Sequence, residues 1–344
     1  MYERIRPILF KLEPERAHHL TLRLLSLAGS VPLVRNQLNK HFSFSDPLLE
    51  TQSFGLDFKN PVGLAGGYDK DGIGMQGLAC LGFGHIELGT VTLKPQGGNP
   101  RPRVFRLIDD QGLINRMGSP NEGGDALLKR IRKWNSSDVV LGVNIGKGVD
   151  TPIEEASGDY VQLLQMFYSH VDYLAVNVSS PNTIGLRQLQ ARDYLEGLLA
   201  TLMEEREILQ EVHGRMVPLL VKLAPDLTEG ELDDALGVIM ESSLDGVIAT
   251  NTTVERGGLS SQFRTETGGL SGIPLRERAR EVVSIIYRRT SGVVPIIGVG
   301  GIFSFEDAKA MFDAGASLIQ IYTGMVYRGP GLVREILEGL ATRD

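Results

Sequence analysis

The sequence predicts a (β/α)8 barrel, or TIM barrel, that carries an N-terminal helical extension. Two observations lead to this prediction: eight short apolar runs recur along the chain, and helix-like segments separate most of them. Near-continuous apolar strands that alternate with helices are typical of a parallel sheet covered by helices. Eight such units favour a closed barrel over a doubly wound sheet, which rarely needs eight repeats.

The eight apolar runs are bounded by glycine, proline and polar residues, which commonly mark strand ends. They span residues 61–67, 85–91, 139–146, 173–179, 218–225, 246–252, 295–301 and 318–324. Between them, apolar residues recur at the three- to four-residue spacing of an amphipathic helix. The clearest helical segments are residues 194–213, 229–242, 275–289 and 305–314.

The first part of the chain differs from the rest in pattern. Segments 1–12 and 15–29 each carry apolar residues at helical spacing, which predicts two short amphipathic helices. We therefore expect two domains, an amphipathic helical hairpin over residues 1–45 and the barrel over residues 46–344.

Within this hairpin, Pro14 fits the first turn of the second helix and Gly29 fits its end, while residues 31–46 have the pattern of a linker. Five cations make the segment basic in an otherwise acidic protein: Arg4, Arg6, Lys11, Arg16 and Arg23. The pattern favours two interpretations equally. One is a hairpin that caps the barrel, and the other is an apolar face that lies on a membrane surface.

The composition is that of an ordinary globular protein. The chain has 344 residues, of which 42% are hydrophobic and 22% charged, and its formal net charge is −7. This charge argues against a nucleic-acid partner. The single cysteine, Cys80, excludes an internal disulfide and a cysteine-built metal site. No apolar run reaches the length of a membrane span, and the first residues do not resemble a secretory signal.

The most informative stretch is residues 173–183, YLAVNVSSPNT, which starts as an apolar strand and ends in amides and hydroxyls. Active sites of such barrels lie at the carboxyl ends of the strands. The other runs also end in small, polar or lysine residues. Polar residues at one end of all eight strands favour a ligand site over ordinary turns. They are Gly66, Gly67, Lys70, Thr90, Asn144, Asn177, Lys222, Thr250, Asn251, Thr252, Gly300, Gly301, Tyr322, Thr323 and Gly324.

Three glycine-rich segments predict a phosphate site. The last two strands end in GVGGI and IYTGM, and TGGLSG, residues 267–272, reads as a third glycine-rich loop. Glycine turns expose backbone N–H groups, and loops after strands seven and eight commonly hold phosphate in these barrels. The chain contains neither a GxxxxGK[ST] loop nor a GxGxxG that opens a helix after the first strand. A mononucleotide such as FMN therefore fits best.

Two lysines and one loop have alternative interpretations. Lys222 lies in an apolar strand, where it is expected to face the N1–C2=O edge of a flavin rather than reach the rim. Lys70 either holds a substrate carboxylate or is solvated beside Asp69 and Asp71. The segment 115–121, NRMGSPN, either closes over a small polar ligand or is a surface excursion.

Taken together, these stretches resemble the dihydroorotate dehydrogenases of class 2, the quinone-linked branch. The resemblance covers about residues 14–330 and runs in order through PERAH, GLAGGYDKDG, GNPRPRVFRL, INRMG, LGVNIGK, VNVSSPNTIGLR, VKLAPD, ATNTT, TGGLSG, GVGGI and IYTG. It implies an FMN barrel that oxidises (S)-dihydroorotate to orotate. Class 1 enzymes place a cysteine where this chain has Ser180, and they lack the N-terminal helices, so both features indicate class 2.

The resemblance also implies roles for individual residues, with Ser180 as the catalytic base. FMN would be held by Gly66, Gly67, Tyr68, Asp69, Lys70, Thr90, Asn144, Asn177, Lys222, Thr250, Gly272, Gly301, Tyr322 and Thr323. Dihydroorotate would be surrounded by Lys70, Asn115, Arg116, Met117, Gly118, Ser119, Asn177, Asn182, Asn251 and Thr252. The quinone site would include His18, Arg106 and Tyr322. The family often has an aromatic residue where this chain has Ser119, so the substrate loop is expected to pack differently here.

The expected partners are dihydroorotate or orotate and a membrane quinone. The protein is expected to be a monomer bound peripherally to the cytoplasmic face of the inner membrane through its N-terminal helices. Two rival functions remain. A tRNA-modifying flavin barrel would need a positive surface and typically a catalytic cysteine. A phosphate-ligand sensor would explain the glycine loops but not Ser180 beside three amides.

Overall fold

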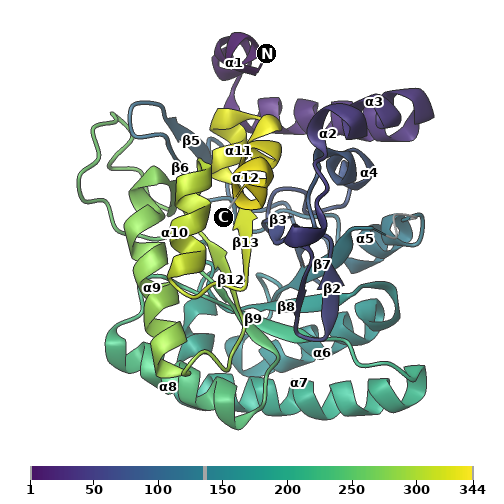
Figure 1. Ribbon diagram of the computed structural model, residues 1–344. Helices are drawn as coiled ribbons and strands as arrows, with labels where there is room; N and C mark the ends of the chain where they lie inside the picture. Colours follow the sequence, from purple (N-terminus) through teal and green to yellow (C-terminus); the bar gives the residue numbers. More distant parts are fainter. Residues whose placement is uncertain (1, 135–137, 343–344) are drawn as a thin grey trace.

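Eight parallel strands close into a barrel in the computed structural model, which describes residues 2–134 and 138–342 (Figure 1). Each barrel strand lies within one of the eight predicted runs, so the predicted fold class is confirmed. Around the barrel the order is β10, β12, β13, β3, β4, β7, β8, β9. The strands are β3 (Val62–Leu64), β4 (His85–Val91), β7 (Val140–Ile145), β8 (Tyr173–Asn177), β9 (Leu219–Leu223), β10 (Gly246–Ala249), β12 (Ile296–Val299) and β13 (Leu318–Ile321).

Helices cover the outside of the barrel, and they leave the strand residues almost entirely buried. The four helices named from the sequence are present within two residues at each end: α7 (Arg192–His213), α8 (Glu229–Glu241), α9 (Arg276–Arg289) and α10 (Phe305–Asp313). Local signals fix two of their starts, because Thr228 and Glu231 form a capping box on α8 and Ser304 caps α10. The remaining outer helices are α5 (Gly124–Ile131), α6 (Ala156–Phe167), α11 (Thr323–Arg328) and α12 (Gly331–Ala341).

A short hairpin closes the amino-terminal end of the barrel. It consists of β1 (Thr51–Ser53) and β2 (Leu56–Phe58), which pair antiparallel. Phe54 and Phe58 insert into the inner core, where their rings meet Tyr173 and His85. Because aromatic rings fill this end, the space for a ligand is left at the carboxyl end.

A second small sheet lies at the carboxyl end of the barrel. Its strands are β5 (Val104–Leu107), β6 (Gly112–Asn115) and β11 (Gly269–Gly272), and all pairings are antiparallel. Segment 267–272 was predicted as a glycine-rich loop, and this was wrong for its last four residues. Gly269 pairs with Asn115 in the register, which brings the end of β6 beside β11.

The N-terminal extension contains three helices rather than two: α1 (Tyr2–Lys11), α2 (Pro14–Ser30) and α3 (Pro32–Phe42). The predicted linker over 31–46 was therefore wrong, because α3 occupies most of it. Gly29 does not end the second helix either. The break falls at Val31, whose extended backbone is the conformation favoured before a proline. Pro14 occupies the first turn of α2, as predicted.

Gly29 instead allows close packing between helices. A side chain at this position would meet the backbone nitrogen of Gly77, at 2.5 Å, where α2 crosses α4 (Met75–Leu78). Figure 1 shows α1, α2 and α3 at the same end of the molecule as β5 and β6. Within the described residues, no helix is both long and apolar enough to cross a membrane.

Candidate active site

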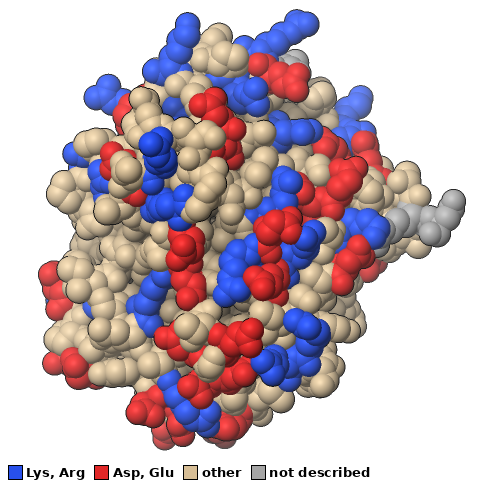
Figure 2. Space-filling view, turned by 90° about the vertical axis from the view of Figure 1, so that its left-hand side faces the viewer, with Lys and Arg blue, Asp and Glu red and all other residues tan. Residues whose placement is uncertain are grey.

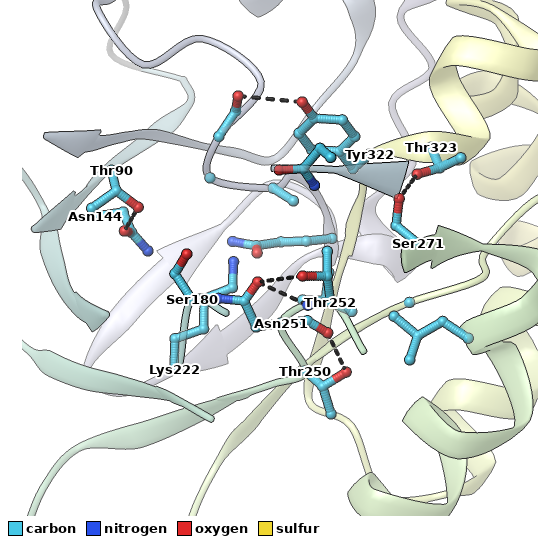
Figure 3. A pocket seen from close by; sticks show the side chains of 18 of the residues that line it. Thr90, Asn144, Ser180, Lys222, Thr250, Asn251, Thr252, Ser271, Tyr322 and Thr323 are labelled. Atoms are coloured by element: carbon cyan, nitrogen blue, oxygen red, sulfur yellow. Dashed lines mark hydrogen bonds between the residues drawn. The ribbon is translucent and has the colours of Figure 1, made fainter. Parts of the chain in front are cut away.

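A cavity of about 980 Å³ opens at the carboxyl ends of the barrel strands. Almost all of the predicted FMN, substrate and catalytic residues line it (Figure 3). They are Gly66, Gly67, Lys70, Thr90, Asn115, Met117, Gly118, Ser119, Asn144, Asn177, Ser180, Asn182, Lys222, Thr250, Asn251, Thr252, Gly272, Gly301, Tyr322 and Thr323. The structure therefore brings together groups that are up to 257 positions apart in the sequence, from Gly66 to Thr323.

One wall of the cavity is a chain of hydrogen-bonded amides and hydroxyls. Thr90 Oγ1 donates to Asn144 Oδ1, and Asn177 Nδ2 donates to Thr90 Oγ1 at 2.7 Å. Asn251 Nδ2 then donates to Ser179 Oγ at 3.0 Å. These bonds fix the orientation of each amide, so the wall presents set donors and acceptors to a ligand.

Ser180 follows β8 and lies partly buried at the edge of the cavity. Its Oγ accepts a hydrogen bond from the backbone N–H of Asn182 at 3.3 Å. Asn182 Nδ2 in turn donates to Asn115 Oδ1 at 3.0 Å. The hydroxyl is thus held in place among amides, and Figure 3 shows it pointing into the same space as the side chain of Lys222.

Arg187 fastens the Ser180 loop to the substrate side of the cavity. Its guanidinium donates to the carbonyl of Ser179 at 3.1 Å and to the carbonyl of Thr252 at 2.9 Å. It also forms an ion pair with Asp226 at 2.7 Å. One side chain therefore sets the spacing between two loops that carry predicted site residues.

Lys70 is the cation of the first loop, and it faces the cavity rather than solvent. Its Nζ contacts the carbonyl oxygen of Gly67 at 3.4 Å and the sulfur of Met117 at 3.7 Å. Burial lowers the pKa of Lys70 to about 8, and the charge of Arg103 adds to this effect while Asp71 opposes it. In the described part of the chain no carboxylate is bonded to this desolvated ammonium, so it suits an anionic ligand.

The glycine-rich segments meet at one corner of the cavity. Gly300 and Gly301 have φ values of 138° and 68°, which favour glycine, and a side chain at Gly301 would meet the backbone of Arg276. Beside them, the hydroxyls of Ser271 and Thr323 lie 2.7 Å apart. Backbone N–H groups and hydroxyls in this arrangement are suited to bind a phosphate.

Three predicted site residues do not line the cavity, and each has another role. Tyr68 lies behind the wall, with its ring 5.4 Å from that of Tyr322. The carboxylate of Asp69 accepts from the backbone N–H groups of Ile73 and Gly74 and is fully buried, and this burial raises its pKa to about 6. Arg116 pairs with Glu266 and stacks over Phe105 at 4.6 Å, outside the cavity.

A buried polar layer that was not predicted from the sequence lies below the cavity. Glu87 of β4 is completely buried, and its carboxylate lies 3.6 Å from Lys222 Nζ. Gln320 of β13 lines the cavity and donates to Glu87 at 2.8 Å. The signal was present, because each is a polar residue within an otherwise apolar strand, but only Lys222 was recognised.

A second cavity, of about 1190 Å³, lies between the N-terminal helices and the barrel. The predicted quinone-site residues His18, Arg106 and Tyr322 all line it, among mostly apolar side chains. Burial, with the charge of Lys70, lowers the pKa of His18 to about 4, so its ring is neutral at pH 7. Four residues line both cavities, so the two are neighbours: Asn115, Met117, Ser271 and Tyr322.

The fold and the cavity place the protein in the class of (β/α)8 barrels with a site for a cofactor and a small polar substrate at the carboxyl ends of the strands. The family model described as dihydroorotate dehydrogenase matches residues 48–343, and the chain belongs to this family. Members of the family use a flavin.

Relatives along the full length of the chain carry a more specific name. A protein of Acidithiobacillus ferrooxidans is 49% identical over 98% of this chain and 94% of its own length, and one of Roseiflexus sp. is 49% identical over 100% and 94%. Both are named dihydroorotate dehydrogenase (quinone). The crystal structure of the Eimeria tenella enzyme in complex with ferulenol superposes with a TM-score of 0.88 at 38% identity, covering 97% of this chain and 93% of that one.

Proposed function

We propose that this protein is a quinone-linked dihydroorotate dehydrogenase of pyrimidine biosynthesis. It oxidises (S)-dihydroorotate to orotate with FMN as the hydride acceptor, and a respiratory quinone takes the electrons onward. The observation that carries the proposal is the pairing of two neighbouring cavities, one built for a polar substrate and a phosphate and the other largely apolar. Full-length relatives named for the same activity support it.

The first cavity fits a flavin mononucleotide. It is lined by both polar and apolar groups from every strand end of the barrel, as a site for a cofactor together with a substrate requires. The glycine corner at Gly300 and Gly301 suits the phosphate, and Lys222 suits the N1–C2=O edge of the ring. The buried Oε1 of Gln320 has no hydrogen-bond partner within residues 2–134 and 138–342, and an N–H of a flavin ring would satisfy it.

The substrate is held by charge and by amides. The ammonium of Lys70 binds the carboxylate of dihydroorotate, and Asn115, Asn182 and Asn251 match the alternating N–H and C=O groups of its ring. A buried polar group without a partner is penalised, so this match selects for the pyrimidine acid. Arg187 keeps the Ser180 and Thr252 loops at the spacing that the ring requires.

Ser180 takes the proton from C5 of the substrate. A serine hydroxyl is a weak base, so it works only when it is positioned and when the proton leaves as the hydride departs from C6. The bound flavin supplies the acceptor for that hydride. The hydrogen bond from Asn182 N–H to Ser180 Oγ, at 3.3 Å, holds the hydroxyl in the cavity.

The second cavity receives the quinone at a membrane surface. The N-terminal extension exposes many large apolar side chains: Ile5, Ile8, Leu12, Leu20, Leu24, Leu27, Leu33 and Val34. Figure 2 shows several Lys and Arg side chains projecting from the end that carries α1, with Asp and Glu side chains among them. Apolar and cationic groups together suit peripheral binding to the cytoplasmic face of the inner membrane, with the protein as a monomer.

The purified protein tests the proposal directly. It is expected to be yellow, to release FMN on denaturation, and to bleach anaerobically when dihydroorotate is added. A ubiquinone analogue should then restore the colour, whereas fumarate and NAD should not. A colourless protein, or a yellow one that dihydroorotate leaves unbleached, contradicts the proposal and favours a phosphate-ligand sensor or a flavin barrel with another substrate.

A further inference from the structure

The most unusual group below the first cavity is the carboxylate of Glu87. It projects from β4 into the barrel interior, is completely buried, and lies directly under the cavity floor. A side chain added at Gly66, which lines the cavity, would meet Glu87 Oε1 at 2.3 Å. Burying a carboxylate costs free energy unless the group is paired and hydrogen-bonded. The partners of Glu87 therefore indicate what the group does here.

The partners of Glu87 all converge from other barrel strands. Asn144 Nδ2 of β7 donates to Oε1 at 2.8 Å, and Gln320 Nε2 of β13 donates to Oε2 at 2.8 Å. The hydroxyl of Tyr173, from β8, donates to Oε2 at 3.3 Å. Lys222 Nζ of β9 lies 3.6 Å from Oε1 and is the cation paired with it.

Because a carboxylate only accepts hydrogen bonds, Glu87 dictates which atom each amide turns toward the cavity. Asn144 must direct Nδ2 to Glu87, so its Oδ1 accepts from Thr90 and from Asn177. Gln320 must direct Nε2 to Glu87, so its Oε1 is left as a buried acceptor without a partner among the residues that the structure describes. Glu87 therefore determines which amide atoms below the flavin act as donors and which act as acceptors.

We infer that Glu87 is a positioning residue for the flavin, whose charge offsets that of Lys222 and thereby sets the reduction potential of the bound cofactor. This inference rests on the proposed function, because it requires that a flavin occupy the cavity. Negative charge gathers near N1 of a reduced flavin, where Lys222 stabilises it. A carboxylate 3.6 Å from this ammonium weakens the stabilisation and holds the potential down.

The test is the potential of the flavin in full-length Glu87→Gln protein, measured by spectroelectrochemistry. The glutamine keeps the size and can still bond its neighbours once one facing amide, Asn144 or Gln320, turns over, but it leaves the charge of Lys222 uncompensated. The equilibrium constant for reduction of the bound flavin should rise at least tenfold. For a two-electron couple, this corresponds to a reduction potential about 30 mV higher. A merely structural role of Glu87 would lower the melting temperature or the flavin content without moving the potential.

Tyr173→Phe is the matched control, because it removes one hydrogen bond to Glu87 and changes no charge. It should change the equilibrium between oxidised and reduced flavin by less than twofold relative to the wild type. An equal shift in both variants, or an unchanged potential in Glu87→Gln, would overturn the inference. A wild-type protein that contains no flavin would instead overturn the proposed function, so the two failures are distinguishable.

A second variant covers the case in which Glu87→Gln loses its flavin. The double change Glu87→Gln with Lys222→Met removes the pair as a unit and leaves no uncompensated buried charge. It should yield more folded protein and a higher melting temperature than Glu87→Gln alone, and flavin content is left out of this comparison because Lys222 itself lines the flavin cavity. If the double variant is no better than the single one, the charge pair does not explain the loss and the inference fails.

Discussion

Glu15 of α2 and Arg103, which precedes β5, form a buried ion pair that fixes the N-terminal helices to the barrel mouth. The two contacts measure 2.6 and 3.1 Å, and both side chains are nearly inaccessible. Arg103 also donates to the carbonyl oxygens of Gly97 and Asn99 at 2.7 and 2.8 Å. The contact therefore joins the helices that line the second cavity to a loop beside the first.

Removing this pair should loosen the N-terminal helices. Breaking a buried ion pair by deleting one partner costs about 3 kcal/mol, so Arg103→Gln should lower the free energy of unfolding by that amount. Arg101 also contacts Glu15, at 2.8 Å, but is 65% exposed, so Arg101→Gln should cost less than about 1 kcal/mol. Urea denaturation of both variants measures the difference, and equal losses would contradict the role given to Arg103.

The same pair predicts sensitivity to acid. Burial would raise the pKa of Glu15, but the hydrogen bonds and charges of Arg103 and Arg101 outweigh it and lower the pKa to about 2. A lowered pKa contributes stability above the ordinary value of 4.5, and that stability is lost as the pH falls from there toward 2. The melting temperature of Glu15→Gln should accordingly decline less than that of the wild type between pH 5 and pH 3, and parallel curves would contradict this.

Ser180→Ala should separate binding from chemistry. The variant keeps the amide wall and Lys70, so it should bind FMN and orotate with near-normal affinity, as measured by the change in flavin absorbance. It lacks the proton acceptor, so flavin reduction by dihydroorotate should slow by 10²–10⁴-fold in stopped flow. Ser180→Cys keeps a group that can accept a proton and should recover part of the rate. Near-normal reduction in Ser180→Ala would remove Ser180 as the base.

The lowered pKa of Lys70 predicts an upper pH limit for substrate binding. Its pKa of about 8 means that the ammonium is charged below pH 8 and neutral above it. Because an anionic ligand needs the charged form, and binding itself raises the pKa, the affinity for orotate should stay level to about pH 8 and then fall by up to tenfold per unit. Lys70→Arg keeps its charge and should bind orotate without this decline. Orotate titrations from pH 6 to pH 10 measure both profiles.

The barrel could be predicted because its eight strands are short, apolar and separated by clear helices. The third N-terminal helix could not, because α3 follows α2 with only Val31 between them, and Pro32 looked like part of a linker. Residues 269–272 looked like a loop, because four residues with two glycines carry no strand pattern. They form a strand only through pairing with β6, which lies about 150 residues earlier. Pairing between distant segments leaves no local signal.

The residues that line the cavity were recognised from the sequence mainly where they end strands, and Lys222 was the one recognised inside a strand. Strand-end amides such as Asn144 and Asn177 interrupt an apolar run, so they were recognised. Glu87 and Gln320 lie within their strands, and only the closed barrel shows that they face inward below the cavity. Tyr68, Asp69 and Arg116 adjoin true cavity residues in sequence, but their side chains point to a second cavity, a helix start and an ion pair.

The last prediction concerns the exposed apolar face of α2. Leu24 and Leu27 are 56% and 64% exposed, and they belong to a helix whose neighbours line the second cavity. The double variant Leu24→Glu with Leu27→Glu should lose binding to vesicles of anionic phospholipid and slow turnover with a long-chain quinone. Flavin reduction by dihydroorotate should remain unchanged, because neither residue touches the first cavity.

A matched change at the other end of the barrel separates a membrane effect from a general loss of solubility or fold. Val293 is 75% exposed and precedes β12, at the amino-terminal end of the barrel and away from the helices. Val293→Glu should leave vesicle binding and quinone turnover as they are in the wild type. A short-chain, water-soluble quinone should also restore turnover in the leucine variant, because it reaches the cavity without a membrane. Equal vesicle binding by the leucine variant and the wild type would refute a membrane role for this face.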